Sequence, residues 1–162
     1  MGMPPPHLAT PGRANPRGIP YLYVATDIHT AILEIRPSTN EFVTIGKFKS
    51  IHNLSILDLS NQKAFDPYSC GNELGSILQI TPFLYMLGKE LSKPVDPKQK
   101  DLHYIPTQYL CEYIKHSGYD GVAYKSNVGT GINIAIFDSK KVKCTRTTLY
   151  ALEAKENVIK NA

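Results

Sequence analysis

Residues 118–137 read GYDGVAYKSNVGTGINIAIF, and the type of fold is most evident in this stretch. Residues 122–126 alternate as a β-strand does, with Val122, Tyr124 and Ser126 on one face. Residues 132–137 are almost wholly apolar, which is typical of a strand buried in the middle of a sheet. The stretch therefore predicts two strands, the second of them inside the protein.

The residues just before this stretch predict a helix. Pro106 and Thr107 are typical of a helix start, and Gly118 is typical of the position just after a helix end. A loop from Pro94 to Asp101 is expected ahead of it. The face of this helix that we expect to be buried contains Leu110, Cys111 and Ile114.

The middle of the chain predicts two further helices. The first covers residues 72–79, and the second starts with Thr81 as its cap and Pro82 at its first position. Three leucines at helical spacing are expected to face the core, namely Leu84, Leu87 and Leu91.

The first part of the chain and its end predict strands and one short helix. Thr26 or Asp27 can cap this helix, and Pro37 follows its end at Ile35. Strands are expected at 21–25, 41–49, 55–59 and, near the end, about 142–150.

Strands and helices follow one another without a regular βα alternation. We therefore expect an α+β fold, a compact domain with a mixed, twisted sheet flanked by short helices. The proline-rich residues 1–12 are expected to be a flexible lead without regular structure, and residues 13–150 to form the domain. Residues 151–162 are expected to be a C-terminal tail, frayed or in a short helix.

Composition restricts the class of protein. Of 162 residues, 42% are hydrophobic and 20% charged, which is usual for a folded domain. The net charge of +4 tolerates a phosphate-bearing ligand or nucleic acid without requiring either. The three cysteines match no disulfide framework, and nowhere do eighteen apolar residues follow one another. We expect a cytoplasmic protein that does not contact a membrane.

The common catalytic and cofactor motifs are absent from the sequence. There is no Walker loop, HExxH or GxSxG, and residues 129–131 (Gly-Thr-Gly) lead into a strand rather than the helix that dinucleotide binding by a Rossmann turn requires. The five histidines never pair at ligand spacing, so no metal site is expected.

Two blocks of the sequence resemble the RES domain family. The first contains a Gly-Arg-x-Asn turn at 12–15, a tyrosine-bearing strand at 21–25 and a helix that ends in Leu-Glu at 33–34. The second contains Pro-Thr-Gln at 106–108, Gly-Tyr-Asp-Gly at 118–121, a Tyr-x-Ser strand end at 124–126 and an apolar strand that ends in Phe137.

The resemblance implies a fold akin to that of ADP-ribosyltransferase toxins and an enzyme that uses NAD as its substrate. Such an enzyme cleaves the nicotinamide–ribose bond by hydrolysis or phosphorolysis, as NAD glycohydrolase or NAD phosphorylase. It also implies a bacterial toxin–antitoxin pair in which the partner is an Xre-type antitoxin. The family's essential residues fall on Arg13, Tyr23, Glu34 and Ser126.

The resemblance gives these four residues distinct roles. Arg13, Glu34 and Ser126 are expected to be catalytic, and Arg13, Tyr23 and Ser126 are expected to bind the substrate. One position departs from the family pattern, because many members have tryptophan after the arginine, whereas this chain has Ala14 and no tryptophan at all. The details of the substrate pocket are therefore expected to differ.

The residue types also suit this chemistry without the resemblance. Departure of nicotinamide leaves positive charge on the ribose, and a carboxylate such as Glu34 stabilises that charge or orients water. Nicotinamide leaves uncharged, so no second acid is required. Arg13 suits a phosphate or ribose oxygen, Tyr23 a stacked ring, and Ser126 a carboxamide or hydroxyl.

Other interpretations stay open at this level. Taken singly, Arg13 and Glu34 suit a solvated surface, Tyr23 suits the core, and Ser126 suits any turn. The same transition state permits a protein ADP-ribosyltransferase. An alternative of another class is a non-catalytic module that binds nucleic acid or protein, but the ten tyrosines are spread along the chain, which disfavours nucleic acid.

Overall fold

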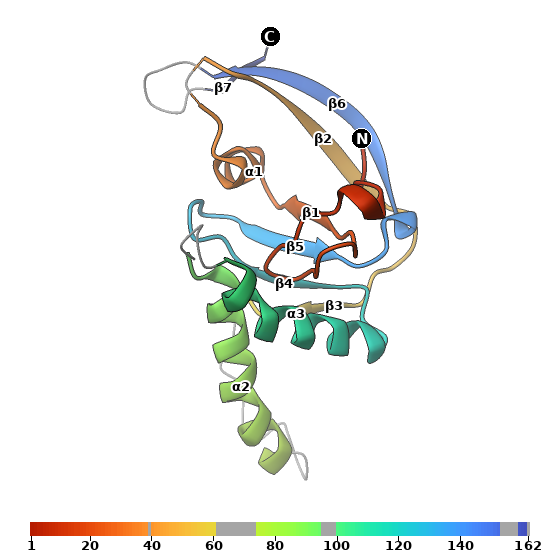
Figure 1. Ribbon diagram of the computed structural model, residues 1–162, viewed down its shortest axis with the longest axis vertical. Helices are drawn as coiled ribbons and strands as arrows, with labels where there is room; N and C mark the ends of the chain where they lie inside the picture. Colours follow the sequence, from red (N-terminus) through yellow and green to blue (C-terminus); the bar gives the residue numbers. More distant parts are fainter. Residues whose placement is uncertain (39, 61–73, 95–99, 153–158, 162) are drawn as a thin grey trace.

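A four-stranded mixed sheet, sheet A, lies at the centre of the computed structural model (Figure 1). The structure describes residues 1–38, 40–60, 74–94, 100–152 and 159–161. The strand order in sheet A is β1-β5-β4-β3, in which β5 pairs antiparallel with β1 and β4, and β4 pairs parallel with β3. Its strands are β1 (Leu22–Ala25), β3 (Ile56–Asp58), β4 (Gly121–Lys125) and β5 (Ile132–Ile136).

The predicted α+β class and mixed sheet are confirmed, and a second sheet accompanies them. Sheet B is antiparallel, with the order β2-β6-β7, and curves over one side of sheet A (Figure 1). Its strands are β2 (Phe42–Ser50), β6 (Val142–Leu152) and β7 (Ile159–Asn161). The prediction of a frayed or helical end after residue 151 is wrong for residues 159–161, because these residues form β7, whose backbone pairs with β6.

Three α-helices and two short 3-10 helices complete the described chain. Helix α1 lies between β1 and sheet B, whereas α2 and α3 cover the opposite side of sheet A (Figure 1). The helices are α1 (Ile28–Ile35), α2 (Leu74–Ser92), α3 (Lys100–His116), and the 3-10 turns η1 (Pro6–Leu8) and η5 (Ser139–Lys141). The prediction that short helices flank the sheet is wrong for two of them, since α2 has 19 residues and α3 has 17.

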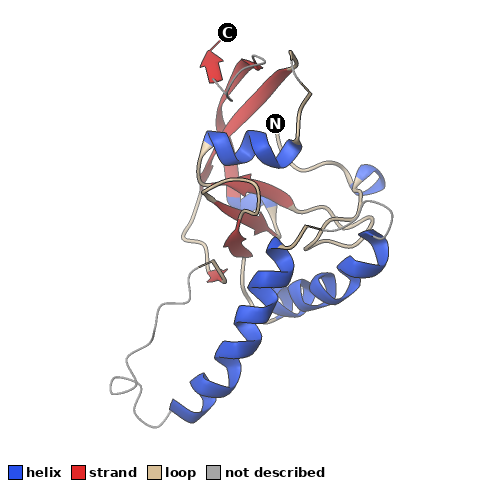
Figure 2. Cartoon of the chain, turned by 90° about the vertical axis from the view of Figure 1, so that its left-hand side faces the viewer, coloured by secondary structure: helices blue, strands red, loops and turns tan. Residues whose placement is uncertain are grey.

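The core lies between sheet A and the C-terminal half of α2 together with α3. The predicted inward positions are confirmed, because Leu87, Leu91, Cys111 and Ile114 are buried, with Leu84 and Leu110 packed partly buried beside them. Figure 2 shows the N-terminal half of α2 extending away from the sheets. The helix is thus anchored at its C-terminal end.

Helix α2 corrects the prediction of two helices in this region. It continues through Thr81 and Pro82. Thr81 is not a cap, since its Oγ1 donates back to the carbonyl of Ile77 at 2.6 Å, as a threonine inside a helix does. The expected start at residues 72 and 73 lies outside the described residues.

Helix α3 begins earlier than predicted. It starts at Lys100, so Pro106 stands inside the helix rather than at its first turn, and the predicted loop is shortened accordingly. Residues 95–99 of that loop lie outside the described part of the chain. The predicted C-terminal end is confirmed, since Gly118 follows with a φ of 91°.

The first residues are more ordered than the sequence predicts. Pro6–Leu8 form one turn of 3-10 helix, for which the fixed φ of proline is suited, and Ala9 is buried. The division of the chain into a lead, a domain and a tail stays a prediction. In the described residues, no helix is long and apolar enough to cross a membrane.

Asp120 ties the turn before β4 to two other segments. Its carboxylate accepts the amide of Ser55 at 2.8 Å and bonds to the ammonium of Lys141. The hydrogen bond from Lys141, followed by that from Ser55, lowers the pKa of Asp120 below its usual 3.8. A lowered folded-state pKa means that the ionised carboxylate stabilises the fold above about pH 4, and that this contribution is lost as the pH falls through the folded value.

The variant Asp120→Ala is expected to lower the Tm by about 2–4 °C at pH 7, the effect of losing about one net hydrogen bond in a chain of this size. The difference from the wild-type chain should shrink below about pH 4, where the carboxylate becomes protonated. Thermal unfolding between pH 2 and pH 8 measures this. Lys141→Met, which keeps the bond to Ser55, should show a smaller loss, and a constant Asp120→Ala difference at all pH values would contradict the assignment.

Candidate functional site

A cleft of about 520 Å³ opens where the loop at residues 12–13 meets α1 and the ends of three sheet A strands. Three of the four predicted site residues line it, namely Arg13, Tyr23 and Glu34. The fourth, Ser126, contacts Glu34 directly. We call this cavity the Glu34 cleft.

The carboxylate of Glu34 is held by two side chains. Its Oε1 accepts a hydrogen bond from Ser126 Oγ at 2.8 Å and another from Asn133 Nδ2 at 2.5 Å. Ser126 Oγ in turn accepts the amides of Val128 at 3.2 Å and Gly129 at 2.9 Å. Because Ser126 accepts from the backbone, its own proton is directed to Glu34, and the carboxylate is fixed in one orientation.

Glu34 lies near the end of α1, and the first turn of this helix fixes the position of the whole helix. Asp27 caps the helix, as predicted, by accepting the amide of Thr30 at 2.8 Å. Thr30 Oγ1 accepts the amide of Gly131 at 3.0 Å, which ties α1 to the turn before β5. A Cβ on Gly129 or Gly131 would lie within 2.6 Å of Thr30 Oγ1, so these glycines permit the close approach of the turn to α1.

Arg13 has a structural function besides facing the cleft. Its Nη1 donates to the carbonyl of Leu91 at 3.0 Å and, more weakly, to that of Ser92 at 3.4 Å. A guanidinium at the C-terminal end of α2 also interacts favourably with the helix dipole. The interpretation of Arg13 as a surface residue of a loose segment is therefore wrong, and part of its guanidinium is already committed within the protein.

Helix α3 holds the backbone of this loop. The hydroxyl of Thr107 donates to the carbonyl of Arg13 at 2.6 Å, and the amide of Gln108 donates to the carbonyl of Gly12 at 2.8 Å. Both side chains are buried. The Pro-Thr-Gln motif at 106–108 thus fixes the position of Arg13 rather than starting a helix.

Tyr23 presents its ring at the cleft and its hydroxyl to the protein. The residue is 43% exposed, so the interpretation of Tyr23 as a core residue is wrong. Its hydroxyl donates to Asn15 Oδ1 at 2.7 Å and accepts the amide of Ala14 at 3.2 Å. Loss of hydration at this enclosed end raises the pKa of Tyr23, which outweighs the lowering by the bond from Ala14.

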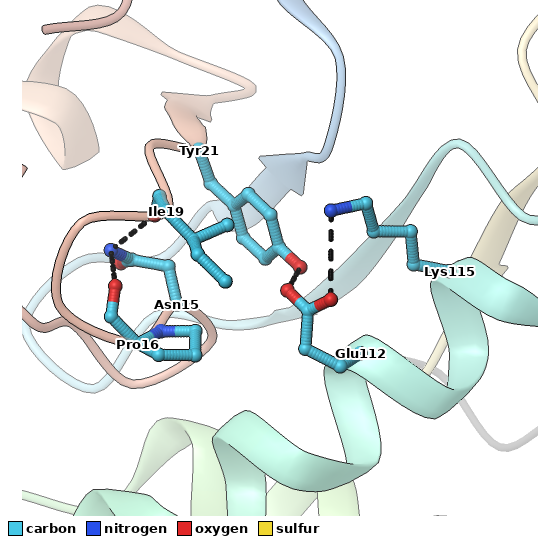
Figure 3. A network of polar contacts seen from close by, with 6 residues as sticks. All are labelled: Asn15, Pro16, Ile19, Tyr21, Glu112 and Lys115. Atoms are coloured by element: carbon cyan, nitrogen blue, oxygen red, sulfur yellow. Dashed lines mark hydrogen bonds and ion pairs between the residues drawn. The ribbon is translucent and has the colours of Figure 1, made fainter. Parts of the chain in front are cut away.

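The turn that carries Arg13 is organised by Asn15, the last residue of the Gly-Arg-x-Asn turn, to which the resemblance gave no role. The side-chain amide of Asn15 donates from Nδ2 to the carbonyls of Thr10 at 3.0 Å, Pro16 at 3.1 Å and Ile19 at 2.9 Å. Figure 3 shows the last two of these bonds. Since Asn15 is only 3% exposed, this amide replaces water for three carbonyls at once.

A second polar group beside this turn joins Tyr21, the residue just before β1, to α3 (Figure 3). The hydroxyl of Tyr21 donates to Glu112, which also lies 3.6 Å from the ammonium of Lys115. Loss of hydration, followed by the bond to Glu112, raises the pKa of the Tyr21 hydroxyl, which stays a donor. The strand that bears Tyr23 is thereby fixed against α3.

Other residues of the cleft were missed as well. Asn133 is the one polar residue in the apolar run 132–137, a signal that could have identified it. Arg36 follows α1 in the left-handed conformation, with a φ of 49°, and adds a second guanidinium to the lining. The remaining aromatic residues that line the cleft are Tyr104 and Tyr124.

The charges of the cleft suit a ligand with anionic and sugar groups. The charged residues that line the cleft are two arginines, Arg13 and Arg36, and one glutamate, Glu34. Cations of this kind favour phosphate oxygens, and a carboxylate favours a positively charged or hydroxyl-bearing centre. Among the described residues, no group of three His, Cys, Asp or Glu side chains is placed to hold a metal ion.

A larger cavity of about 750 Å³ lies between α1, β1 and sheet B. It shares part of β1 and α1 with the Glu34 cleft, namely Tyr23, Val24, Ala25, Ala31 and Ile35. Neither Arg13 nor Glu34 lines it, and its walls are mainly apolar. The candidate site is therefore the smaller cavity, where the polar side chains converge.

The fold and the cleft define a small α+β domain whose cleft is lined by an oriented glutamate and two arginines. This chain belongs to the RES domain family, whose family model matches residues 1–153. The resemblance noted in the sequence is thus confirmed. No curated protein matches the chain, and no solved structure matches it.

The departure from the family pattern has a packing consequence. Ala14, which stands where many members have tryptophan, is fully buried in the core cluster. A larger side chain at this position would require the surrounding core to be rebuilt. The roles of Arg13, Tyr23, Glu34 and Ser126 in substrate binding and catalysis stay predictions.

Proposed function

We propose that this chain is an NAD-degrading enzyme that cleaves the nicotinamide–ribose bond in the Glu34 cleft, as a glycohydrolase or a phosphorylase. The observation that carries the proposal is the carboxylate of Glu34, oriented by Ser126 and Asn133 in a cleft that also contains Arg13. Family membership supports it, because RES domains are associated with toxin–antitoxin systems.

The proposed chemistry depends mainly on Glu34. As the bond to nicotinamide lengthens, positive charge develops on the ribose, and a nearby carboxylate stabilises it. Both described hydrogen bonds to Glu34 reach Oε1, so Oε2 has no partner in the described residues and is available to a ribose hydroxyl or to the attacking water. The leaving nicotinamide is neutral and requires no acid.

The remaining side chains bind the substrate in this proposal. The exposed ring of Tyr23 stacks on a heteroaromatic ring, and Arg13 together with Arg36 neutralises the pyrophosphate. Ser126 acts on the substrate through the orientation of Glu34, which modifies the direct binding role expected from the sequence.

The biological setting is also a proposal. An ADP-ribosyltransferase-like fold accords with the α+β class, and a toxin of this kind would act in the bacterial cytoplasm, where NAD is available. RES domains are generally associated with antitoxin partners, and we propose an Xre-type antitoxin for this chain.

Incubation of the protein with NAD tests the activity. Nicotinamide release is expected, and its dependence on inorganic phosphate distinguishes phosphorolysis from hydrolysis. NAD carrying a labelled adenylate distinguishes both from a protein ADP-ribosyltransferase, which would leave the label on protein. If no nicotinamide is released with or without phosphate, the proposed function is wrong.

A further inference from the structure

Tyr124 brings to the Glu34 cleft a hydroxyl that no hydrogen bond within the described part of the chain uses. The residue is only 3% exposed. Yet no fully enclosed side-chain oxygen or nitrogen among the described residues lacks a partner. The hydroxyl must therefore be among the few atoms of Tyr124 that reach solvent, and Tyr124 meets solvent in the cleft that it lines.

The position of Tyr124 in sheet A places this hydroxyl near the candidate catalytic group. Tyr124 on β4 stands directly opposite Asn133 on β5, so the two side chains share one face of the sheet. Asn133 donates to Glu34 at 2.5 Å. The phenol is thus one strand away from the side chain that orients the carboxylate.

The hydroxyl can act only as a neutral group at physiological pH. Loss of hydration raises the pKa of Tyr124, and the neighbouring Tyr23 raises it further, whereas Arg13 opposes this effect. The phenol therefore keeps its proton and offers one hydrogen-bond donor to the cleft.

A phenylalanine at this position would serve the core equally well. The ring of Tyr124 belongs to the core cluster with Val122, Leu91 and Cys111. Its hydroxyl gives up most of its hydration and gains no bond in return, which costs free energy in the absence of a ligand. Groups of this kind, costly to the fold and open to a cleft, are typical of binding sites.

We propose that Tyr124 is a further substrate-binding residue, which donates a hydrogen bond to a ribose hydroxyl of the ligand in the Glu34 cleft. The inference rests on the proposed function, in which Glu34 faces the nicotinamide-bearing ribose. The ribose is the chosen partner because the phenol lies beside Asn133, which holds that same carboxylate.

A comparison of two equally buried tyrosines separates an effect on ligand binding from an effect on stability. Tyr21 and Tyr124 are each 3% exposed, but the Tyr21 hydroxyl bonds to Glu112, whereas that of Tyr124 has no described partner. Titration calorimetry with ADP-ribose and, separately, with nicotinamide measures binding to the wild-type chain, Tyr124→Phe and Tyr21→Phe. Thermal unfolding without ligand measures the stability of each.

Tyr124→Phe is expected to weaken ADP-ribose binding about three- to ten-fold, the effect of one neutral hydrogen bond. It should leave nicotinamide binding unchanged and should not lower the Tm. Tyr21→Phe is expected to lower the Tm and to leave the affinity for ADP-ribose unchanged.

The outcomes distinguish this inference from the proposed function. If the wild-type chain binds ADP-ribose and Tyr124→Phe binds it equally well, the role of Tyr124 is wrong while the proposed function stands. A lowered Tm in Tyr124→Phe, or a loss confined to nicotinamide, would also overturn it. If the wild-type chain binds neither NAD nor ADP-ribose and releases no nicotinamide, the proposed function and the role of Tyr124 are both wrong.

Discussion

Glu34→Gln is expected to lower the rate of NAD cleavage by about 10²–10⁴-fold, the range over which a positioned charged or proton-transferring group contributes to catalysis. The glutamine keeps the length of the side chain, and its carbonyl oxygen can still accept from Ser126 and Asn133. The change therefore removes the negative charge and little else. Glu34→Ala should lose a similar share of the turnover, because it lacks the carboxylate altogether.

Nicotinamide release measures the rate, and thermal unfolding shows that each variant is folded. Glu90→Gln is a matched control, since Glu90 is an exposed glutamate on α2 that pairs with Lys93 at 3.5 Å. This control should retain full activity. Full activity in Glu34→Gln would show that the carboxylate does not take part, and a large fall in Tm would assign it a structural role.

Local structure was predicted correctly where the residues that determine it lie close together in the sequence. Asp27 was predicted as a cap of α1 because the cap and its amide partner, Thr30, lie within one turn. The same reasoning failed at Thr81 and Pro82, where a start signal stands inside α2. There the residues before Thr81 are already helical and Thr81 Oγ1 bonds back to the carbonyl of Ile77, whereas a short start signal does not reveal the conformation of the preceding turn.

A mixed sheet was predicted, but the division of the strands into two sheets was not, for a related reason. The alternation in 41–49 and in 142–150 predicts strands, but it does not say which strands pair. Phe42 stands opposite Ala151, and the register shifts between Lys47 and Phe48, so the pairing is set by contacts about a hundred residues apart. The pairing that makes sheet B is therefore a property of the three-dimensional fold and not of the local pattern.

The candidate site was predicted as a set of residues but not as a geometry. The resemblance selected Glu34 and Ser126, and the structure brings them to 2.8 Å from one another. It gave Asn133 and Asn15 no role in the site, because an asparagine in a strand or turn looks the same in sequence whether it is solvated or completes a polar network. Only burial and partners separate these cases.

Asn15→Ala is expected to lower the free energy of unfolding by about 3 kcal/mol, and hence the Tm by about 6–12 °C in a chain of this size. The alanine removes the amide that serves the carbonyls of Thr10, Pro16 and Ile19. It also leaves the hydroxyl of Tyr23 without its acceptor. Urea unfolding followed by circular dichroism measures the loss.

Arg17→Ala is a suitable control, because Arg17 is exposed in the same turn, and its Tm should change by about 1 °C or less, as surface substitutions usually do. An equal loss in the two variants would show that the turn, and not Asn15, is the sensitive feature. Kinetics well below the Tm then separate fold from function. Asn15 contacts Tyr23 and not Glu34, so Asn15→Ala should raise the KM for NAD more than it lowers kcat. A fall confined to kcat would instead mean that the turn governs the carboxylate, and the division of the cleft into binding and catalytic parts would have to be abandoned.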